Sequence, residues 1–337
     1  MERVRQFLEK SAVKLASLKA GGRDGMLLVV SRDLARAAPA QATPTLQAAL
    51  DDWSTIATVL ESEYHALNVG LVEGTPLDMH ALAAPLPRAY QWLDGSAYLT
   101  HVKRMRMARG AEMPPNFLTE PLMYQGLSDQ FLGPREPMCV EDEAWGLDFE
   151  GEVAAITDDV PRGCGPAAAA AHIKLLLLVN DISLRKLIPA ELAKGFGFLH
   201  GKPACAASPV AVTPDELGVA WDGARLHGRL AIELNGKRFG DPDAGADMQF
   251  GFPDLIAHAA KTRRLGAGTV IGAGTVSNAE IERGCACIVE QQVLEVLDGG
   301  KAQTPFLRYG DRVRMQLLDA GGKSIFGTIE QEVRPCR

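Results

Sequence analysis

Short strand-like segments separated by turn residues fill most of the chain after residue 87, and they limit the folds that it can adopt. Examples are GLDFEGEVAAI, GRLAIELNGKRFG, CACIVEQQVLEVLDGG and DRVRMQLLDAGGKSIFGTIEQEV, and the Asn-Gly pair in the second is typical of a hairpin turn. Helical patterns interrupt these segments in three places, at 97–109, 166–178 and 249–261. The mixture predicts an α+β fold built on a mixed β-sheet and argues against a doubly wound parallel sheet.

The first part of the chain has its own pattern of strands and a helix. Two short strands around a turn are expected between 13 and 35, followed by a helix over 46–60. The Pro- and Gly-rich stretch after that helix is the best candidate linker, with the boundary near Pro85. Since 337 residues suffice for about two domains, we expect a small β-rich domain over 1–84 and a larger domain over 85–337.

Charge and cysteine usage exclude several classes of protein. The chain has 35 Lys and Arg residues and 42 Asp and Glu residues, which gives a net charge of −7. It therefore has no excess of positive charge that would favour binding to nucleic acid. The six cysteines form no CxxC pair, so neither a disulfide framework nor a zinc site is indicated.

No segment of the sequence has the pattern of a signal peptide or a membrane span. Residues 1–12, which we expect to be an extension with little role in the fold, are charged and lack an apolar core. The longest apolar run, 167–179, is interrupted by His172 and Lys174 and is too short to span a bilayer. We therefore expect a cytoplasmic protein that acts on a small molecule and has no nucleic-acid or membrane partner.

Two carboxylates stand two residues apart in LDFEGEVAAI, at Glu150 and Glu152. Alternate residues of a strand point to the same face, so these side chains would lie a few ångströms apart. Like charges at that distance repel unless a cation or a proton lies between them. A solvated strand face is the alternative, and the apolar neighbours Phe149 and Val153 favour the metal-binding interpretation.

Two further segments contain an acidic residue in a notable position: one directly after an apolar run and one near a histidine. Asp181 directly follows the apolar run IKLLLLVN, although an Asn-Asp pair is equally common as a turn or a helix cap. Asp94 and His101 are seven residues apart, which on one helix is about two turns or roughly 10.5 Å. Such a pair could hold a short substrate, or Asp94 could simply cap the helix while His101 packs elsewhere.

The glycine-rich segment GAGTVIGAGTVSN, over 266–278, does not match a dinucleotide fingerprint because its glycines run G-x-G-x-x-x-G. A tight strand and turn that brings Thr275 to a substrate fits better. The sequence contains neither a G-x-S-x-G elbow nor an HExxH motif. The basic residues of 97–109 are expected to form a solvated face, although one could meet a substrate carboxylate; they are Lys103, Arg104, Arg106 and Arg109.

Taken together, these segments resemble the fumarylacetoacetate hydrolase family. The pattern D-x-E-x-E-x-A, followed about thirty residues later by ND-x-S-x-R and then by GK with a following SP, is specific only in combination. The resemblance covers residues 85–335, and the N-terminal part looks like the small SH3-like domain of that family. The matching positions are Asp94 and His101 in D-x6-H, Tyr124 in MYQG, Glu150 and Glu152 in DFEGEVA, Asp181 and Arg185 in VNDISLR, Lys202 in HGKPACAASP, and Thr275 in GAGTVSN.

The resemblance implies a mixed β-sheet roll and a metal-dependent hydrolase that cleaves a carbon–carbon bond. Mg²⁺ or Ca²⁺ is the implied cofactor, because all-oxygen ligands select hard cations. The implied ligands are Asp94, Glu150, Glu152 and Asp181. His101 corresponds to the general base, since the imidazole of histidine ordinarily titrates near neutral pH. Glu290, expected on a C-terminal strand, is the candidate for the carboxylate partner of that base.

The remaining implied roles concern charge stabilisation and substrate binding. Arg185 and Lys202 correspond to the cations that stabilise the oxyanion and the departing enolate. Tyr124 and Thr275 correspond to substrate-binding groups, and Arg109 is a weaker candidate for a distal substrate carboxylate. The resemblance also implies a homodimer.

Three positions depart from the family pattern and leave the substrate open. Ser96, Ile188 and Ala206 stand where animal enzymes carry tyrosine, glutamine and threonine. The leading hypothesis is hydrolysis of a 2,4-diketo acid, with fumarylacetoacetate of tyrosine breakdown as the favoured substrate and other acylpyruvates as the alternative. A decarboxylase, isomerase or hydratase of a 2-oxo-dioic acid is the next hypothesis, and a non-catalytic metal-stabilised binding protein is the last.

Overall fold

The computed structural model describes residues 12–108, 110, 112–113 and 115–336, so Arg109 and most of the N-terminal extension lie outside the described residues. The strands are β1 (Lys14–Leu18), β2 (Met26–Val30), β3 (Arg36–Pro39), β4 (Thr75–Pro76), β5 (Gln91–Gly95), β6 (Met123–Gln125), β7 (Met138–Val140), β8 (Leu147–Asp148), β9 (Gly151–Thr157), β10 (Ile173–Asn180), β11 (Ser183–Leu184), β12 (Ala206–Ala207), β13 (Ala211–Val212), β14 (Arg229–Leu234), β15 (Lys237–Gly240), β16 (Thr269–Gly272), β17 (Arg312–Leu318) and β18 (Ile329–Pro335). The α-helices are α2 (Leu46–Asp51), α3 (Trp53–Asn68), α4 (Leu99–Ala108), α5 (Pro166–Ala169), α6 (Ile188–Leu192), α7 (Pro214–Leu217), α8 (Phe252–Ala259) and α9 (Ile288–Gly299). Short 3₁₀ turns are η1 (Glu143–Trp145), η2 (Ala170–His172), η3 (Gly218–Ala220) and η4 (Ile281–Arg283).

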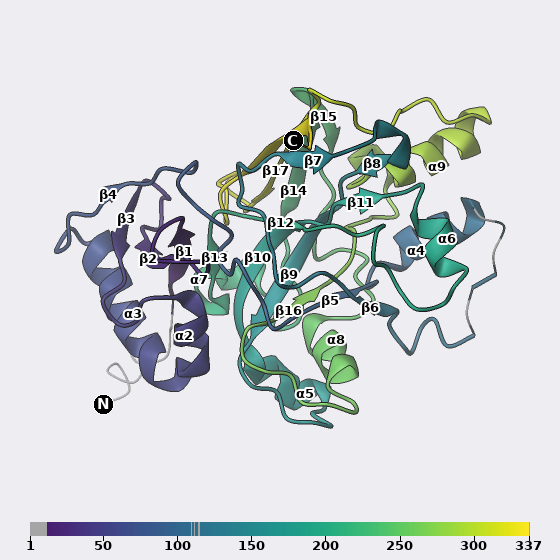
Figure 1. Ribbon diagram of the computed structural model, residues 1–337. Coiled ribbons are helices and arrows are strands. Elements are labelled where there is room, and N and C mark those ends of the chain that lie inside the picture. The colour runs from purple at the N-terminus through teal and green to yellow at the C-terminus, as the bar shows by residue number, and fades with distance from the viewer. Residues whose placement is uncertain (1–11, 109, 111, 114, 337) are drawn as a thin grey trace.

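One large mixed sheet runs through the described part of the chain (Figure 1). Its order is β4-β3-β2-β1-β13-β10-β9-β16-β5-β6, with β12 also paired to β10. The N-terminal strands join this sheet where β1 pairs with β13, and β16 pairs in parallel with β5. A second sheet has the order β15-β14-β17-β18-β7, and β11 pairs with β8. The predicted α+β class and the mixed sheet are therefore confirmed.

The two faces of the large sheet are covered by different helices. Alternate residues of β9 enter two separate apolar clusters, with Val153 and Ala155 in one and Ala154 and Ile156 in the other. Helices α2 and α3 belong to the second cluster, and α8 belongs to the first. In Figure 1, α2 and α3 lie beside the N-terminal strands, while α8 lies below the central ones. Both faces are thus buried, which stabilises the strand ends that carry the candidate site.

The local patterns explain the elements that were correctly predicted. KLASL and MLLVV form β1 and β2, and LNGKRF forms the hairpin between β14 and β15. Asn235 and Gly236 in that turn have φ values of 54° and 74°, a conformation that favours these two residue types. Helix α8 lies within the predicted 249–261.

Three predicted elements were wrong in type or extent. The segment 173–178 is not helical: it belongs to β10, a central strand whose continuous apolar run is buried on both faces. CIVEQQVLEVLDGG is helix α9 rather than a strand, and it ends at Gly300, whose φ of 74° suits a helix C-cap. The helix predicted over 46–60 is two helices, α2 and α3, and the second continues to Asn68.

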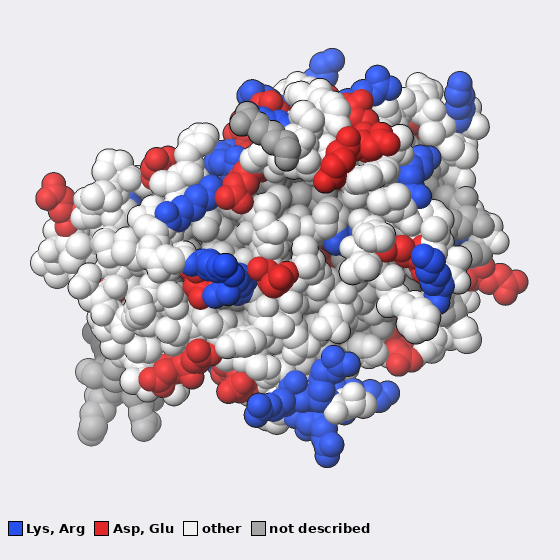
Figure 2. Space-filling view, viewed as in Figure 1, with Lys and Arg blue, Asp and Glu red and all other residues white. Residues whose placement is uncertain are grey.

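Figure 2 shows acidic and basic side chains on one face of the molecule, with several basic ones gathered at its lower edge. Among the described residues, no helix has the length and apolar character needed to cross a membrane.

Candidate active site

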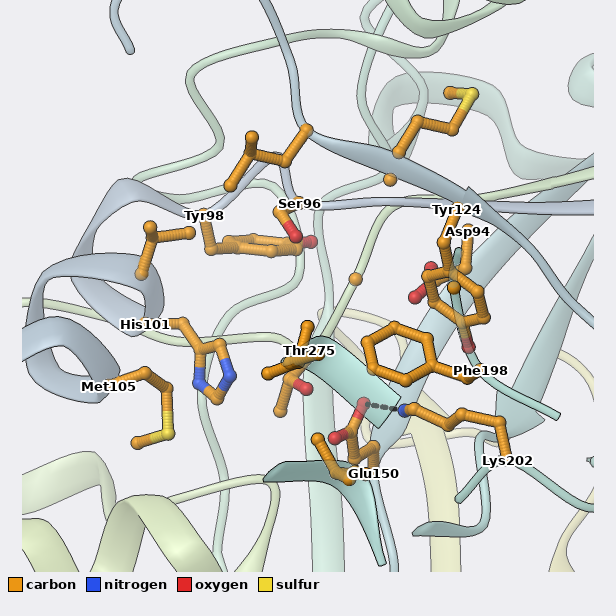
Figure 3. Close-up of a pocket in the computed structure, with 18 of the residues that line it drawn as sticks. Asp94, Ser96, Tyr98, His101, Met105, Tyr124, Glu150, Phe198, Lys202 and Thr275 are labelled. Carbon is orange, nitrogen blue, oxygen red and sulfur yellow. Dashed lines mark hydrogen bonds and ion pairs between the residues drawn. The ribbon is translucent and has the colours of Figure 1, made fainter. Parts of the chain in front are cut away.

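A cavity of about 550 Å³ opens beside the ends of β5 and β6 and the start of α4. Figure 3 shows His101 and Met105 projecting from α4 on one side, with Asp94 and Tyr124 on the other. Seven of the residues predicted from the sequence line this one cavity: Asp94, His101, Tyr124, Glu150, Arg185, Lys202 and Thr275.

Three buried carboxylates converge where neighbouring strands of the large sheet end. Asp94 lies in β5, Glu152 lies in β9, and Asp181 directly follows β10. One oxygen from each lies within 4.8 Å of the others. Gly272 of β16 pairs with Asp94 and separates β5 from β9, and a Cβ atom at Gly272 would lie 2.5 Å from Oδ1 of Asp94. The glycine therefore provides the space that the carboxylate occupies.

The electrostatics of these carboxylates favour a bound cation. Oδ1 of Asp94 and both carboxylate oxygens of Glu152 are buried without a hydrogen-bond partner. Burial raises the pKa of Asp94, and the negative charge of Asp181 raises it further. Burial likewise raises the pKa of Glu152, with Asp94 adding to the effect. Because unpaired buried charges are costly and oxygen donors suit hard cations, the three side chains fit a divalent ion such as Mg²⁺, Ca²⁺ or Mn²⁺.

Glu150 differs from the other three predicted metal ligands because two cations hold it. Its Oε1 lies 2.5 Å from Nη2 of Arg185, and its Oε2 lies 3.2 Å from Nζ of Lys202. Burial alone would raise the pKa of Glu150, but Lys202 and Arg185 outweigh that effect and lower it. Glu150 is therefore ionised and charge-compensated, and its role as a metal ligand stays a prediction.

Asp181 receives donors from three neighbours. Nζ of Lys202 donates to its Oδ2, the hydroxyl of Tyr124 donates to the same atom over 2.8 Å, and the thiol of Cys205 donates to its Oδ1 over 2.9 Å. Burial would lower the pKa of Lys202, but Asp181 and Glu150 outweigh it and raise that pKa. Lys202 therefore keeps its positive charge while it lines the cavity.

His101 is paired with a carboxylate from a distant helix. Its Nδ1 lies 2.5 Å from Oε2 of Glu290, which belongs to α9. Arg104 and Ser277 donate to the other oxygen of Glu290 over 2.5 and 2.7 Å. Burial would raise the pKa of Glu290, but these partners, His101 first, lower it. Ionised Glu290 therefore fixes the orientation of the His101 ring through Nδ1. Nε2 is the ring nitrogen that Glu290 does not contact.

Comparisons with known proteins identify the family. The profile described as "Fumarylacetoacetate (FAA) hydrolase C-terminal" matches residues 91–334, and "Fumarylacetoacetase N-terminal domain 2" matches residues 13–88. The chain belongs to the fumarylacetoacetate hydrolase family. A comparison with curated protein sequences found no significant match.

Solved structures with similar folds include several fumarylacetoacetate hydrolase family members. A putative HpcE protein from Mycobacterium smegmatis has a TM-score of 0.67 and 20% identity, covering 96% of this chain and 100% of that one. Fumarylacetoacetate hydrolase from Exiguobacterium antarcticum gives 0.66 and 18%, again covering 96% and 100%. Maleylpyruvate hydrolase from Sphingobium sp. SYK-6, in complex with manganese(II) and pyruvate, gives 0.62 and 15% with the same coverage. This chain therefore shares its fold with solved structures that carry different enzyme names.

The family member's site differs in two respects from the geometry predicted by sequence. Asp94 and His101 do not share a helix: Asp94 lies in strand β5, and His101 lies on α4, which begins at Leu99. Glu290 lies on a helix rather than on a C-terminal strand, because the segment that carries it forms α9. Ser96 and Ile188 line the cavity, whereas Arg109 lies outside the described residues.

Sequence reasoning missed two residues that support the family's site. Arg104 is not part of a solvated face: it is 8% exposed and binds Glu290. Its spacing of three from His101 places both on one side of α4, which is a signal that the sequence did contain. Asp148 is fully buried, accepts from Nε of Arg185 over 2.8 Å and accepts from the backbone N–H of Ile288 over 2.8 Å. One carboxylate therefore fixes both Arg185 and the N-terminus of α9.

Proposed function

We propose that this protein is a metal-dependent hydrolase that cleaves the carbon–carbon bond of a β-diketo acid. The observation that carries the proposal is that one cavity is lined by His101 of the His101–Glu290 pair, by Asp94 of the carboxylate cluster and by the buried cations Arg185 and Lys202. The family includes hydrolases and isomerases, and a positioned imidazole beside a carboxylate partner suits the activation of water. The sequence favours fumarylacetoacetate, which would yield fumarate and acetoacetate. Acylpyruvates, which would yield a carboxylate and pyruvate, are the alternative substrates.

His101 would perform the proton transfers. Its ring removes a proton from water, and the hydroxide adds to the carbonyl carbon of the acyl group. When the tetrahedral intermediate collapses, the bond to the neighbouring methylene breaks and releases a carboxylic acid. The methylene carbon leaves as an enolate and takes the proton back from the ring, so that water is fully accounted for. Glu290 holds the ring in place and stabilises its protonated form.

Arg185 and Lys202 would stabilise the negative charge that develops. Both line the cavity, and the structure holds each with buried carboxylates. Their positions are therefore set before the reaction begins, which is the condition under which fixed charges contribute most.

A divalent cation would be held by Asp94, Glu152 and Asp181. When bound, it would polarise the two carbonyl groups of the substrate. The unpartnered buried oxygens of Asp94 and Glu152 support this assignment.

The test is loss of the diketo absorbance of fumarylacetoacetate, with acetylpyruvate alongside, in Mg²⁺ and then in EDTA. Loss of either substrate that requires the metal supports the proposal, and the two rates distinguish the two substrate types. His101→Ala, assayed in parallel, measures the rate of substrate loss that does not depend on the proposed base. Absence of cleavage of both substrates in Mg²⁺, Ca²⁺ and Mn²⁺ would overturn the proposal and favour a decarboxylase or hydratase.

A further inference from the structure

The cavity has two chemically different ends. One end carries ionic groups from the strands and the following loops: Asp94, Glu150, Arg185 and Lys202. The rest of its lining includes apolar side chains from α4, β6 and α6 with their adjoining loops: Val102, Met105, Leu122, Met123, Ile188 and Leu192. Phe198 also lines the cavity and stacks edge-on against Tyr124, with 4.9 Å between ring centres.

The proposed reaction determines which part of a substrate meets the apolar lining. The dicarbonyl unit is the polar part of a β-diketo acid, and it matches the end with Arg185 and Lys202. The carbonyl that is attacked must lie within reach of a water molecule at His101. The group beyond that carbonyl then extends along α4, where Met105 follows His101 by about one helical turn (Figure 3).

This apolar lining is incompletely covered by the protein itself. Leu122 and Leu192 are 43% and 46% exposed, although both line the cavity. Ile188 is almost fully buried and contributes a wall that offers no hydrogen bond. An alkyl or aryl group placed here would remove apolar surface from water, which is favourable in proportion to the area covered.

A terminal carboxylate in the same place would find few partners. Among the described lining residues, Arg106 is the one cation outside the ionic end, and its Nη1 already donates to the backbone carbonyl of Glu112 over 2.6 Å. The hydroxyl groups of Ser96 and Thr275 also line the cavity, but a carboxylate against the apolar side chains named above would lose hydration without a cation to compensate.

We propose that this site selects β-diketo acids whose acyl group ends in an apolar alkyl or aryl group rather than in a second carboxylate. The inference rests on the proposed function, but it favours apolar acylpyruvates in place of fumarylacetoacetate, whose acyl group ends in a carboxylate. Water cleaves such a substrate, R–CO–CH₂–CO–COO⁻, to R–COO⁻ and pyruvate, and one proton is released.

The test compares kcat/KM for butanoylpyruvate and succinylpyruvate, which differ only by a methyl or a carboxylate at the end of the acyl chain. Pyruvate release is measured with the holoenzyme in Mg²⁺, and acetylpyruvate and benzoylpyruvate complete the series. We expect butanoylpyruvate to exceed succinylpyruvate by about tenfold or more, and to exceed acetylpyruvate by roughly threefold per added methylene.

Two variants locate the preference in the structure. Met105→Gln keeps the length of the side chain and adds polarity, so the ratio of butanoylpyruvate to acetylpyruvate should fall severalfold. Ile188→Gln is a second test of the apolar lining, so that one variant gives a result if the other folds poorly. Val219→Ala is the control: this side chain is fully exposed and lies outside the cavity lining, so the ratio should not change.

The outcomes separate this inference from the proposed function. If no diketo acid in the series and no fumarylacetoacetate is cleaved, the proposed function fails. If cleavage occurs but succinylpyruvate equals or exceeds butanoylpyruvate, the apolar selection is wrong while the hydrolase assignment stands. A succinylpyruvate preference that disappears in Arg106→Met would assign the distal position to carboxylate binding instead.

Discussion

Nδ1 of His101 lies 2.5 Å from Oε2 of Glu290, although 189 residues separate the two in the chain. The contact joins α4, which follows the strand that carries Asp94, to α9, whose N-terminus Asp148 holds. Arg104 and Ser277 bind the other carboxylate oxygen and prevent Glu290 from rotating. The geometry of the proposed base thus depends on packing between two helices and not only on the histidine.

Removal of the imidazole should abolish turnover and spare the metal site. We expect His101→Ala to lower kcat by about 10²–10⁴-fold, because general-base catalysis typically contributes that much. His101 is not a member of the Asp94–Glu152–Asp181 cluster, so Mg²⁺ affinity measured by calorimetry should stay within about threefold of wild type. A near-normal kcat would refute the assignment of His101 as the base.

Glu290→Gln tests whether the carboxylate positions the base. The amide keeps the shape but removes the negative charge that pairs with Nδ1 of His101, so kcat should fall by about 10²-fold or more. A thermal melt of the variant separates two explanations. A fall in kcat with an unchanged Tm assigns the effect to the position of the ring, whereas a matching loss of stability would indicate a purely structural role.

The carboxylate cluster of Asp94, Glu152 and Asp181 should control metal affinity. We expect Glu152→Gln to weaken Mg²⁺ binding by about a hundredfold or more, because the variant loses a charged oxygen ligand. Glu150→Ala should weaken it less and should lower kcat, because the change leaves Arg185 and Lys202 without a shared partner. Equal affinity in Glu152→Gln and wild type would place the metal elsewhere.

Part of the fold and of the site could be predicted from the sequence, and specific physical reasons explain the predictions that were wrong. The seven predicted residues that line the cavity each belong to a short motif, so their identity could be proposed before their surroundings were known. The run IKLLLL gives no periodicity that separates a buried helix from a strand buried on both faces, and the wrong choice was made for β10. In α9, Glu290 and Val293 are buried three residues apart, as on one face of a helix, but the β-branched residues Ile288 and Val289 also suit a strand.

Long-range contacts account for what the sequence could not provide. Arg104 resembles its exposed neighbour Lys103 in type, and only the position of Glu290 on α9 determines that Arg104 is buried. Asp148 similarly gains its role from Arg185 and from the backbone of Ile288, which is 140 residues away. No local pattern reports partners at such separations.

The raised pKa values of Asp94 and Glu152 predict a pH-dependent stability of the metal-free protein. Burial raises both, so the folded chain holds more protons than the unfolded chain once the pH exceeds an ordinary carboxyl pKa of about 4. Stability in EDTA should therefore fall as the pH rises from there through the raised values. Since Mg²⁺ competes with those protons, the increase in Tm on adding Mg²⁺ should grow with pH.

Thermal melts with EDTA or Mg²⁺ at several pH values between 5 and 8 measure this effect. Glu152→Gln is the matched variant, because it cannot lose a proton at that position, and its melts should depend less on pH in EDTA. Equal increments in Tm at every pH for the wild-type protein would contradict the linkage between these carboxyl groups and the metal.

Gly272 tests the claim that close approach of β16 to β5 creates the space for Asp94. A Cβ atom at this position would lie 2.5 Å from Oδ1 of Asp94 and 2.4 Å from Cη2 of Trp92. Gly272→Ala must therefore displace the carboxylate or the ring, and we expect a loss of about 1–3 kcal/mol in unfolding free energy. We also expect at least about tenfold weaker Mg²⁺ binding.

Gly266→Ala provides the comparison within the same glycine-rich segment, because a Cβ atom there meets nothing within 4 Å. This variant should keep both stability and Mg²⁺ affinity close to those of wild type. If the two alanine variants bind Mg²⁺ equally well, Asp94 does not need the space beside Gly272 to serve as a ligand. If only Gly272→Ala loses affinity, and a melt in EDTA shows that it still folds, the loss reflects displacement of Asp94 rather than unfolding.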